Sequence, residues 1–172
     1  MQIRKARLAD IPQVNRLVNG YAESGIMLRR PLAVLYENIR DLVVAEEEGN
    51  VLGTGGLHVM WQDLAEVRSL AVLPERKGDG IGRRLVEFML EEARDLGIGR
   101  VFALTYQRPF FERQGFTVVS KESLPQKVWT ECVYCEKFNS CDEIAMERWL
   151  REPGSGRLEE IPLIERPLWV RG

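Results

Sequence analysis

Three glycines at alternate positions precede a stretch with helical spacing. Gly78, Gly80 and Gly82 stand in "PERKGDGIGRRL", and apolar residues then recur at the period of a helix. A helix N-terminus offers unpaired N–H groups and the positive end of the helix dipole, so a loop without side chains there can surround phosphate oxygens closely. The pattern predicts an anion-binding loop. The loop alone also leaves open a flexible helix start that binds no ligand.

The spacing of these glycines differs from that of two familiar phosphate-binding loops. The loop of nucleoside triphosphatases requires Gly, four residues and then Gly-Lys-Ser/Thr, whereas Arg83 and Arg84 follow the last glycine here. A dinucleotide fingerprint, GxGxxG, would place its third glycine where Arg83 stands. Neither of these two sites is predicted.

Side chains suited to acid–base chemistry and to binding a carboxylate lie elsewhere in the chain. Glu66 and Arg68 stand on a predicted strand, "LAEVRSLAVL", and the single histidine, His58, stands on another. Arg29 and Arg30 form a pair, and a guanidinium is suited to bidentate binding of a carboxylate. Taken singly, the alternatives are a solvated strand carboxylate, a structural histidine and exposed surface arginines.

The segments that position these residues alternate between helix and strand patterns, as in a mixed α/β domain. Helices are predicted after Asp10 as a cap, from about Pro31 over "PLAVLYENIR", before a stop at Gly97, and over "RPFFERQ". The expected buried faces are Ile11, Val14, Leu17, Val18 and Tyr21 in the first helix and Ile81, Leu85, Phe88, Met89, Ala93 and Leu96 in the third.

Strand patterns occur in "QIRKARL", in "DLVVAEEEGNVLGTGGLHVMW" with a hairpin turn at Gly49 and Asn50, and in "LAEVRSLAVL", "RVFALTY" and "FTVVS". After Ser120 the pattern weakens, and "DEIAMERWL" suits either a helix or a closing strand. The linker-like "REPGSGR" indicates one domain over 1–150 and a C-terminal extension or tail over 151–172.

The composition is that of an ordinary globular domain, with 172 residues, 45% of them hydrophobic and 29% charged, and a net charge of −2. No apolar run approaches the roughly 20 residues of a membrane span, and no leader pattern is present, so a cytoplasmic protein without a membrane partner is expected. Near-neutral charge argues against a nucleic-acid partner.

The three cysteines are Cys132, Cys135 and Cys141. Their state is left open between reduced thiols, a disulfide between the first two, and a zinc site, and no metal is assigned.

Together with its surroundings, the glycine loop resembles the acetyl-CoA pyrophosphate loop of the GNAT N-acetyltransferase superfamily. That motif is Arg/Gln-x-x-Gly-x-Gly/Ala after a strand such as "VRSLAVLPE", and Lys77, Gly80 and Gly82 occupy its defining positions. The resemblance covers Gln2 to Ser120 and includes "PFFERQGF". It implies an α/β (α+β) fold with a mixed, mostly antiparallel central sheet, flanked by about four helices, whose fourth and fifth strands splay apart around acetyl-CoA.

The resemblance also implies roles for individual residues. Leu70 and Val72 would offer backbone groups to the pantetheine arm, and the Leu70 N–H would hold the thioester oxygen. Glu66 stands at a general-base position and, by strand alternation, on the face of Leu70. His58 is a second candidate, acting through water. The implied cofactor-binding residues are Leu70, Ala71, Val72, Lys77, Gly78, Asp79, Gly80, Ile81, Gly82 and Arg83, with Arg84 nearby.

Phe111 stands where many members of the superfamily carry a tyrosine that protonates the departing thiolate. Phenylalanine cannot donate a proton. The thiolate therefore leaves without a dedicated acid, which its low proton affinity permits, or Tyr106 takes the role.

The segments "GIMLRRP", "EVRSLAV", "LTYQRPFFERQGF" and "LPQKVWTECVYCEKFNSCDEIAM" together resemble the short bacterial N-acetylglutamate synthases, as far as about Leu150. This resemblance implies transfer of acetyl to the α-amine of L-glutamate, the first step of arginine biosynthesis. Arg30 matches a substrate-carboxylate arginine, and Arg29, Arg68 and Lys127 are further candidates.

Other readings of the resemblance stay open. Longer synthases carry an arginine-sensing kinase-like domain that this sequence does not show, so arginine feedback is not implied. Homodimers are common in the superfamily, and the sequence leaves open whether this protein forms one. The alternatives for function are an acetyltransferase for another small amine or amino acid, and a non-catalytic acetyl-CoA-binding regulator.

Overall fold

The computed structural model describes residues 1–125 and 141–152. Its centre is a seven-stranded sheet in the order β1-β2-β3-β4-β5-β7-β6. The strands are β1 (Gln2–Lys5), β2 (Leu42–Glu47), β3 (Asn50–Trp61), β4 (Leu64–Val72), β5 (Arg100–Thr105), β6 (Thr117–Val118) and β7 (Ile144–Trp149). The α-helices within these ranges are α1 (Ile11–Glu23), α2 (Leu32–Glu37), α3 (Ile81–Asp95) and α4 (Arg108–Arg113). The predicted sheet with four flanking helices is confirmed.

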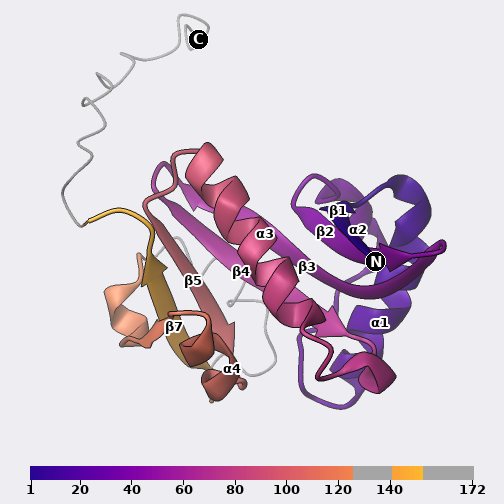
Figure 1. Ribbon diagram of the computed structural model, residues 1–172. Helices are drawn as coiled ribbons and strands as arrows, with labels where there is room; N and C mark the ends of the chain where they lie inside the picture. Colours follow the sequence, from indigo (N-terminus) through magenta and orange to yellow (C-terminus); the bar gives the residue numbers. More distant parts are fainter. Residues whose placement is uncertain (126–140, 153–172) are drawn as a thin grey trace, which may run out of the picture.

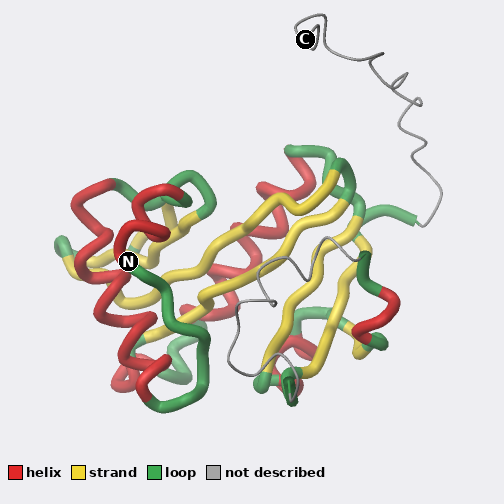
Figure 2. Tube along the Cα trace, turned by 180° about the vertical axis from the view of Figure 1, so that it is seen from behind, coloured by secondary structure: helices red, strands yellow, loops and turns green. Residues whose placement is uncertain are grey.

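Two hydrophobic layers hold the helices against opposite faces of the sheet. Helix α3 crosses the face seen in Figure 1, and α1 lies on the other face, seen in Figure 2. The α3 layer depends on glycines in β3, because an added Cβ at Gly53 would lie 3.0 Å from Ile81 and one at Gly55 would lie 2.9 Å from Met89. These glycines let α3 approach the sheet closely.

The parallel pair β4 and β5 separates after a short contact. Leu64, Ala65 and Glu66 of β4 pair with Arg100, Val101 and Phe102 of β5, although β4 continues to Val72 and β5 to Thr105. The other neighbouring strands are antiparallel. The predicted splay is therefore confirmed, and it begins just beyond Glu66.

The two long helices keep most of their predicted faces. In α1 the buried residues are Ile11, Val14, Leu17 and Val18. In α3 they are Ile81, Leu85, Val86, Met89, Leu90 and Ala93, so Val86 and Leu90 widen the predicted stripe. The prediction of a buried Leu96 is wrong, because α3 ends at Asp95 and the Leu96 side chain is 57% exposed beside Gly97 with its positive φ of 77°.

Asp10 does not cap α1 through its side chain, contrary to the prediction. Its carboxylate instead accepts two hydrogen bonds from the Arg4 guanidinium, at 2.7 and 3.0 Å, and one from the Arg7 N–H at 2.7 Å. A charged donor on β1 competes for this carboxylate more effectively than the helix N–H groups do. The hydrogen bonds from Arg4, and then the one from Arg7, hold the pKa of Asp10 below its usual value.

Several boundaries differ from the sequence prediction. The β2–β3 turn lies one residue earlier, at Glu48 and Gly49, which both have positive φ as a tight hairpin turn requires. Helix α2 ends at Glu37, where the Asn38 side chain donates to the Val34 carbonyl. The closing segment is the strand β7. Of the predicted extension over 151–172, residues 153–172 lie outside the described residues.

Among the helices that the structure describes, none has the length and apolar character needed to cross a membrane.

Candidate active site

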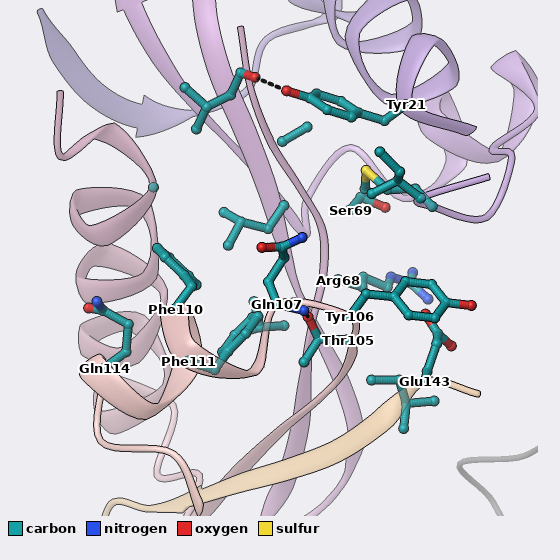
Figure 3. A pocket seen from close by; sticks show the side chains of 18 of the residues that line it. Tyr21, Arg68, Ser69, Thr105, Tyr106, Gln107, Phe110, Phe111, Gln114 and Glu143 are labelled. Carbon is teal, nitrogen blue, oxygen red and sulfur yellow. Dashed lines mark hydrogen bonds between the residues drawn. The ribbon is translucent and has the colours of Figure 1, made fainter. Parts of the chain in front are cut away.

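A cleft of about 1350 Å³ opens where β4 and β5 part, and Figure 3 shows part of its lining. Its walls come from the end of α1 and the chain that follows it, from β4, from the glycine loop and start of α3, and from β5 with α4. Ligand pockets usually measure roughly 300–1,000 Å³. The cleft therefore has room for a large ligand together with a smaller one.

A bulge shapes the β4 wall. Thr54 pairs with Ala71 and Gly56 with Arg68, so two β4 residues oppose Gly55, and one of them, Ser69, has a positive φ of 54°. The bulge breaks the alternation of side chains along the strand.

The bulge corrects the expected placement of Leu70. Its side chain packs with the α3 core, 3.3 Å from a Cβ built on Gly55. Glu66 and Arg68 keep regular alternation with each other on the opposite face. The prediction that Glu66 and Leu70 share a face is therefore wrong. The role predicted for the Leu70 backbone N–H does not depend on its side chain and stays a prediction.

The glycine loop has the backbone geometry that an anion-binding loop needs. Gly78 and Gly80 have φ of 94° and 76°, values that favour glycine. The Arg84 N–H makes the first intrahelical bond, to Gly80 O at 3.1 Å, so the N–H groups of Ile81 to Arg83 lie before the ladder begins. At Gly82 a Cβ would lie 3.3 Å from the Phe110 ring. Bare backbone and helix N–H groups thus meet at this end of the cleft.

Tyr21 and Arg76 line the cleft beside this loop, although the sequence did not indicate either of them as a site residue. Tyr21 of α1 donates a hydrogen bond to Val72 O at 2.7 Å, and Lys77 Nζ lies 4.8 Å from the centre of the Tyr21 ring. Arg76 lines the cleft and bonds Asp79 at 2.7 Å. The helical spacing that marked Tyr21 as a core residue gave no signal of this contact.

The predicted cofactor residues are not all part of the cleft wall. The described lining includes Leu70, Ala71, Val72, Lys77, Gly78, Gly80, Ile81, Gly82 and Arg83. Asp79 and Arg84 are not among these lining residues. The Asp79 carboxylate instead holds Arg76.

Glu66 and His58, the two acid–base candidates, occupy different positions. Glu66 lines the cleft at the last β4 residue that pairs with β5, where these two strands begin to separate. His58 lies opposite Glu66 on β3 but outside the described lining, and its Nδ1 is 2.5 Å from Asp41 Oδ2. Of the two candidates, Glu66 is therefore the one among the described lining residues of the cleft.

Arg68 lines the cleft and is held from β3 and from the end of α2. Its Nη2 lies 3.0 Å from His58 Nδ1. The same nitrogen donates to Asp41 Oδ2 and Asn38 Oδ1, each at 3.3 Å. Asn38 and Asp41 carried no signal in the sequence, because their role arises only where the chain after α2 meets β4.

Both arginines of the pair line a smaller hollow beside α1, and Arg30 also lines the main cleft. Arg30 lines the main cleft, and its backbone N–H and C=O both bond the Asn19 side chain, at 2.9 and 3.0 Å. Arg29 is exposed and belongs only to the smaller hollow. Lys127, the remaining candidate, lies outside the described residues.

The aromatic candidates differ in burial. Phe111 is 4% exposed and packs edge-to-face on Phe110 and Phe116. Tyr106 lines the cleft, and its hydroxyl donates to Asp142 at 2.6 Å. Figure 3 shows both residues. Of the two, Tyr106 carries a hydroxyl that can donate a proton, and Phe111 does not.

Cys141 also lines the cleft, whereas Cys132 and Cys135 lie outside the described residues. Within 1–125 and 141–152, no three His, Cys, Asp or Glu side chains are grouped for a metal ion. The alternatives of free thiols, a disulfide and zinc for the three cysteines stay open.

Comparison with known proteins finds relatives that match most of the chain. The profile of the Acetyltransferase (GNAT) family matches residues 16–116. An uncharacterized N-acetyltransferase of Chlorobaculum tepidum is 45% identical over 86% of this chain and 96% of its own. An amino-acid acetyltransferase of Mycobacterium tuberculosis is 42% identical over 75% of each chain.

Two solved structures have similar folds. A Mycobacterium tuberculosis protein in complex with CoA and NLQ has a TM-score of 0.77 at 36% identity, over 88% of this chain and 100% of that one. The N-acetylglutamate synthase of Neisseria gonorrhoeae, complexed with coenzyme A and N-acetyl-glutamate, has a TM-score of 0.80 at 30% identity, over 87% of this chain and 35% of that one.

Proposed function

This chain belongs to the GNAT family of acetyltransferases, and on that premise we propose that it makes N-acetyl-L-glutamate from L-glutamate. It is an acetyl-CoA-dependent amino-acid N-acetyltransferase. The choice of glutamate is supported by the Neisseria structure, which holds N-acetyl-glutamate. It is also supported by the two arginines on the acceptor side of the cleft, Arg30 and Arg68. The product would serve arginine biosynthesis.

The residues of the glycine loop suit the pyrophosphate of acetyl-CoA. The N–H groups before the first intrahelical bond and the positive φ at Gly78 and Gly80 allow close approach of phosphate oxygens. Lys77, Arg76 and Arg83 add positive charge around the same part of the cleft. When bound there, the co-substrate supplies an acetyl group on a thioester.

Glu66 is proposed as the general base of the reaction. An ammonium has no lone pair, so the amine must lose a proton before it attacks a carbonyl carbon. Glu66 is the carboxylate at the point where β4 and β5 separate, and it lines the cleft. The Leu70 N–H, which follows the bulge at Ser69, is proposed to stabilise the negative charge that develops on the thioester oxygen.

The position of Arg30 carries the proposal for an acidic acceptor. Its backbone is fixed to α1 by the two hydrogen bonds with Asn19, and Arg30 lines the cleft from the chain that follows α1. An acceptor whose amine lies at Glu66 would extend its side chain away from β4. We assign Arg30 to the side-chain carboxylate, which a guanidinium can bind through two N–H groups.

The test compares L-glutamate with L-glutamine in the wild type, in Arg30→Gln and in a control, Arg94→Gln, which removes an exposed arginine at the end of α3. Release of CoA thiol gives kcat/KM for each acceptor. The wild type should favour glutamate, and Arg30→Gln should lower kcat/KM for glutamate by about 100-fold, as expected for loss of a close charge pair, with a smaller loss for glutamine. Equal losses for both acceptors, or a wild type that favours glutamine, would reject glutamate recognition by Arg30.

A further inference from the structure

A polar cluster behind Arg68 has no part in the function described so far. It consists of Asn38, Asp41 and His58, whose side chains all contact Arg68 Nη2, at 3.0 to 3.3 Å. The Arg68 side chain is only 8% exposed, and those of Asp41 and His58 are 22% and 27% exposed. The hydrogen bonds from Arg68 to Asn38 and Asp41 are weakly screened by solvent at this depth, so they restrict the position of the guanidinium.

The cluster is built on a fixed backbone. The Asn38 side-chain nitrogen donates to Val34 O at 2.8 Å, which turns its oxygen toward Arg68. The Asp41 N–H donates to Asn38 O at 3.0 Å, and the Asp41 carbonyl accepts from the Leu57 N–H, also at 3.0 Å. Asp41 is therefore anchored to the turn after α2 and to β3, independently of its carboxylate.

His58 and Arg68 share the Asp41 carboxylate. A hydrogen on His58 Nδ1 satisfies the 2.5 Å contact with Asp41 Oδ2, and the same oxygen accepts from Arg68 Nη2 at 3.3 Å. A carboxylate between two donors holds both of them in place. Asp41 is the acidic member of the cluster, and its Oδ2 is the common acceptor for His58 and Arg68.

We propose that Asp41 is a positioning residue, which holds Arg68 where the guanidinium binds the α-carboxylate of the acceptor. The inference rests on the proposed function. Arg68 stands two residues after Glu66 on the same face of β4, and both line the cleft. The α-carboxylate shares a carbon with the reacting amine, so an amine at Glu66 brings that carboxylate toward Arg68. Arg30 lies on another wall and suits the more distant side-chain carboxylate.

The test measures kcat and KM for L-glutamate, L-glutamine and acetyl-CoA in Asp41→Asn, with Asp95→Asn as a control that removes an exposed carboxylate from α3. Because both acceptors carry an α-carboxylate, Asp41→Asn should raise KM for both by about 10-fold, the size of one charge-assisted hydrogen bond. The kcat and the KM for acetyl-CoA should change less than about 3-fold. Asp41→Glu, which keeps the charge, should recover part of the loss.

A double-variant cycle separates positioning from general damage. If Asp41 acts through Arg68, Asp41→Asn added to Arg68→Gln should raise KM no further than Arg68→Gln alone. Additive losses, an unchanged or lower acceptor KM in Asp41→Asn, or a loss for glutamate only would overturn the inference. Failure of the proposed function appears separately, as a wild type that acetylates no amino acid, and it would overturn this inference also.

Discussion

At the scale of single residues, the site depends on which acidic and basic groups line the cleft. Glu66 on β4 and His58 on β3 are paired residues of neighbouring strands. Glu66 is among the described residues that line the cleft, whereas His58 is not and contacts Asp41 instead. We therefore give proton removal to Glu66 and a supporting role to His58. The sequence named both residues but could not separate them, because Asp41 is brought to His58 only by the fold.

Replacement of these two residues should have different kinetic effects. Glu66→Gln should lower kcat by about 10²- to 10⁴-fold, the usual contribution of a general base. His58→Gln should change kcat by less than about 10-fold and act mainly on the KM for the acceptor, since His58 contacts Asp41, which holds Arg68. Steady-state rates of CoA release at saturating acetyl-CoA test both. A loss of kcat in His58→Gln equal to that in Glu66→Gln would reassign the base to His58.

At the scale of elements, the β4 bulge and the glycine loop set the two ends of the site. Alternation predicted Leu70 on the face of Glu66, but the positive φ of Ser69 moves the Leu70 side chain to the α3 core. Positive φ is uncommon for residues other than glycine, so a serine at this position does not indicate it. The bulge could therefore not be predicted from the sequence. The positive φ of Gly80 and the start of α3 at Ile81 could be, because glycine and apolar periodicity mark them directly.

The link between β1 and α1 gives a prediction about pH. Because the pKa of Asp10 is lower in the folded protein than in the unfolded chain, its carboxylate stabilises the fold above about pH 4, and this stability is lost as pH falls through the folded-state pKa. Asp10→Asn should be less stable than the wild type by about 1–3 kcal/mol at neutral pH. The difference should shrink as pH falls through the folded-state pKa of Asp10, because the wild-type carboxyl is then protonated.

Thermal unfolding followed by circular dichroism at several pH values measures this difference. Asp95→Asn, at an exposed site on α3, is the matched control and should follow the wild type. A difference between Asp10→Asn and the wild type that stays constant across the acid range would show that the carboxylate charge has no part in holding Arg4.

At the scale of the whole molecule, the mostly antiparallel sheet with its splayed fourth and fifth strands was predictable mainly through the family resemblance. Most of the contacts between residues of the cleft were not predictable. In the sequence alone, Lys77, Gly80 and Gly82 indicate the part of the chain that would bind the co-substrate. The proposed acceptor side combines α1, the turn after α2, β3 and β4, and long-range packing brings these together. Whether the protein forms a homodimer stays open, and a cytoplasmic location and the extension over 151–172 stay predictions.

The most direct measurement is the identity of the product. Acetyl-CoA labelled with ¹³C at the acetyl carbonyl is incubated with the enzyme and ¹⁵N-labelled L-glutamate, and the mixture is followed by NMR. The account predicts a carbonyl signal split by coupling to the α-nitrogen, formed faster than with L-glutamine or L-aspartate. Free CoA without a coupled carbonyl signal, or faster acetylation of an amine that lacks an acidic side chain, would contradict it.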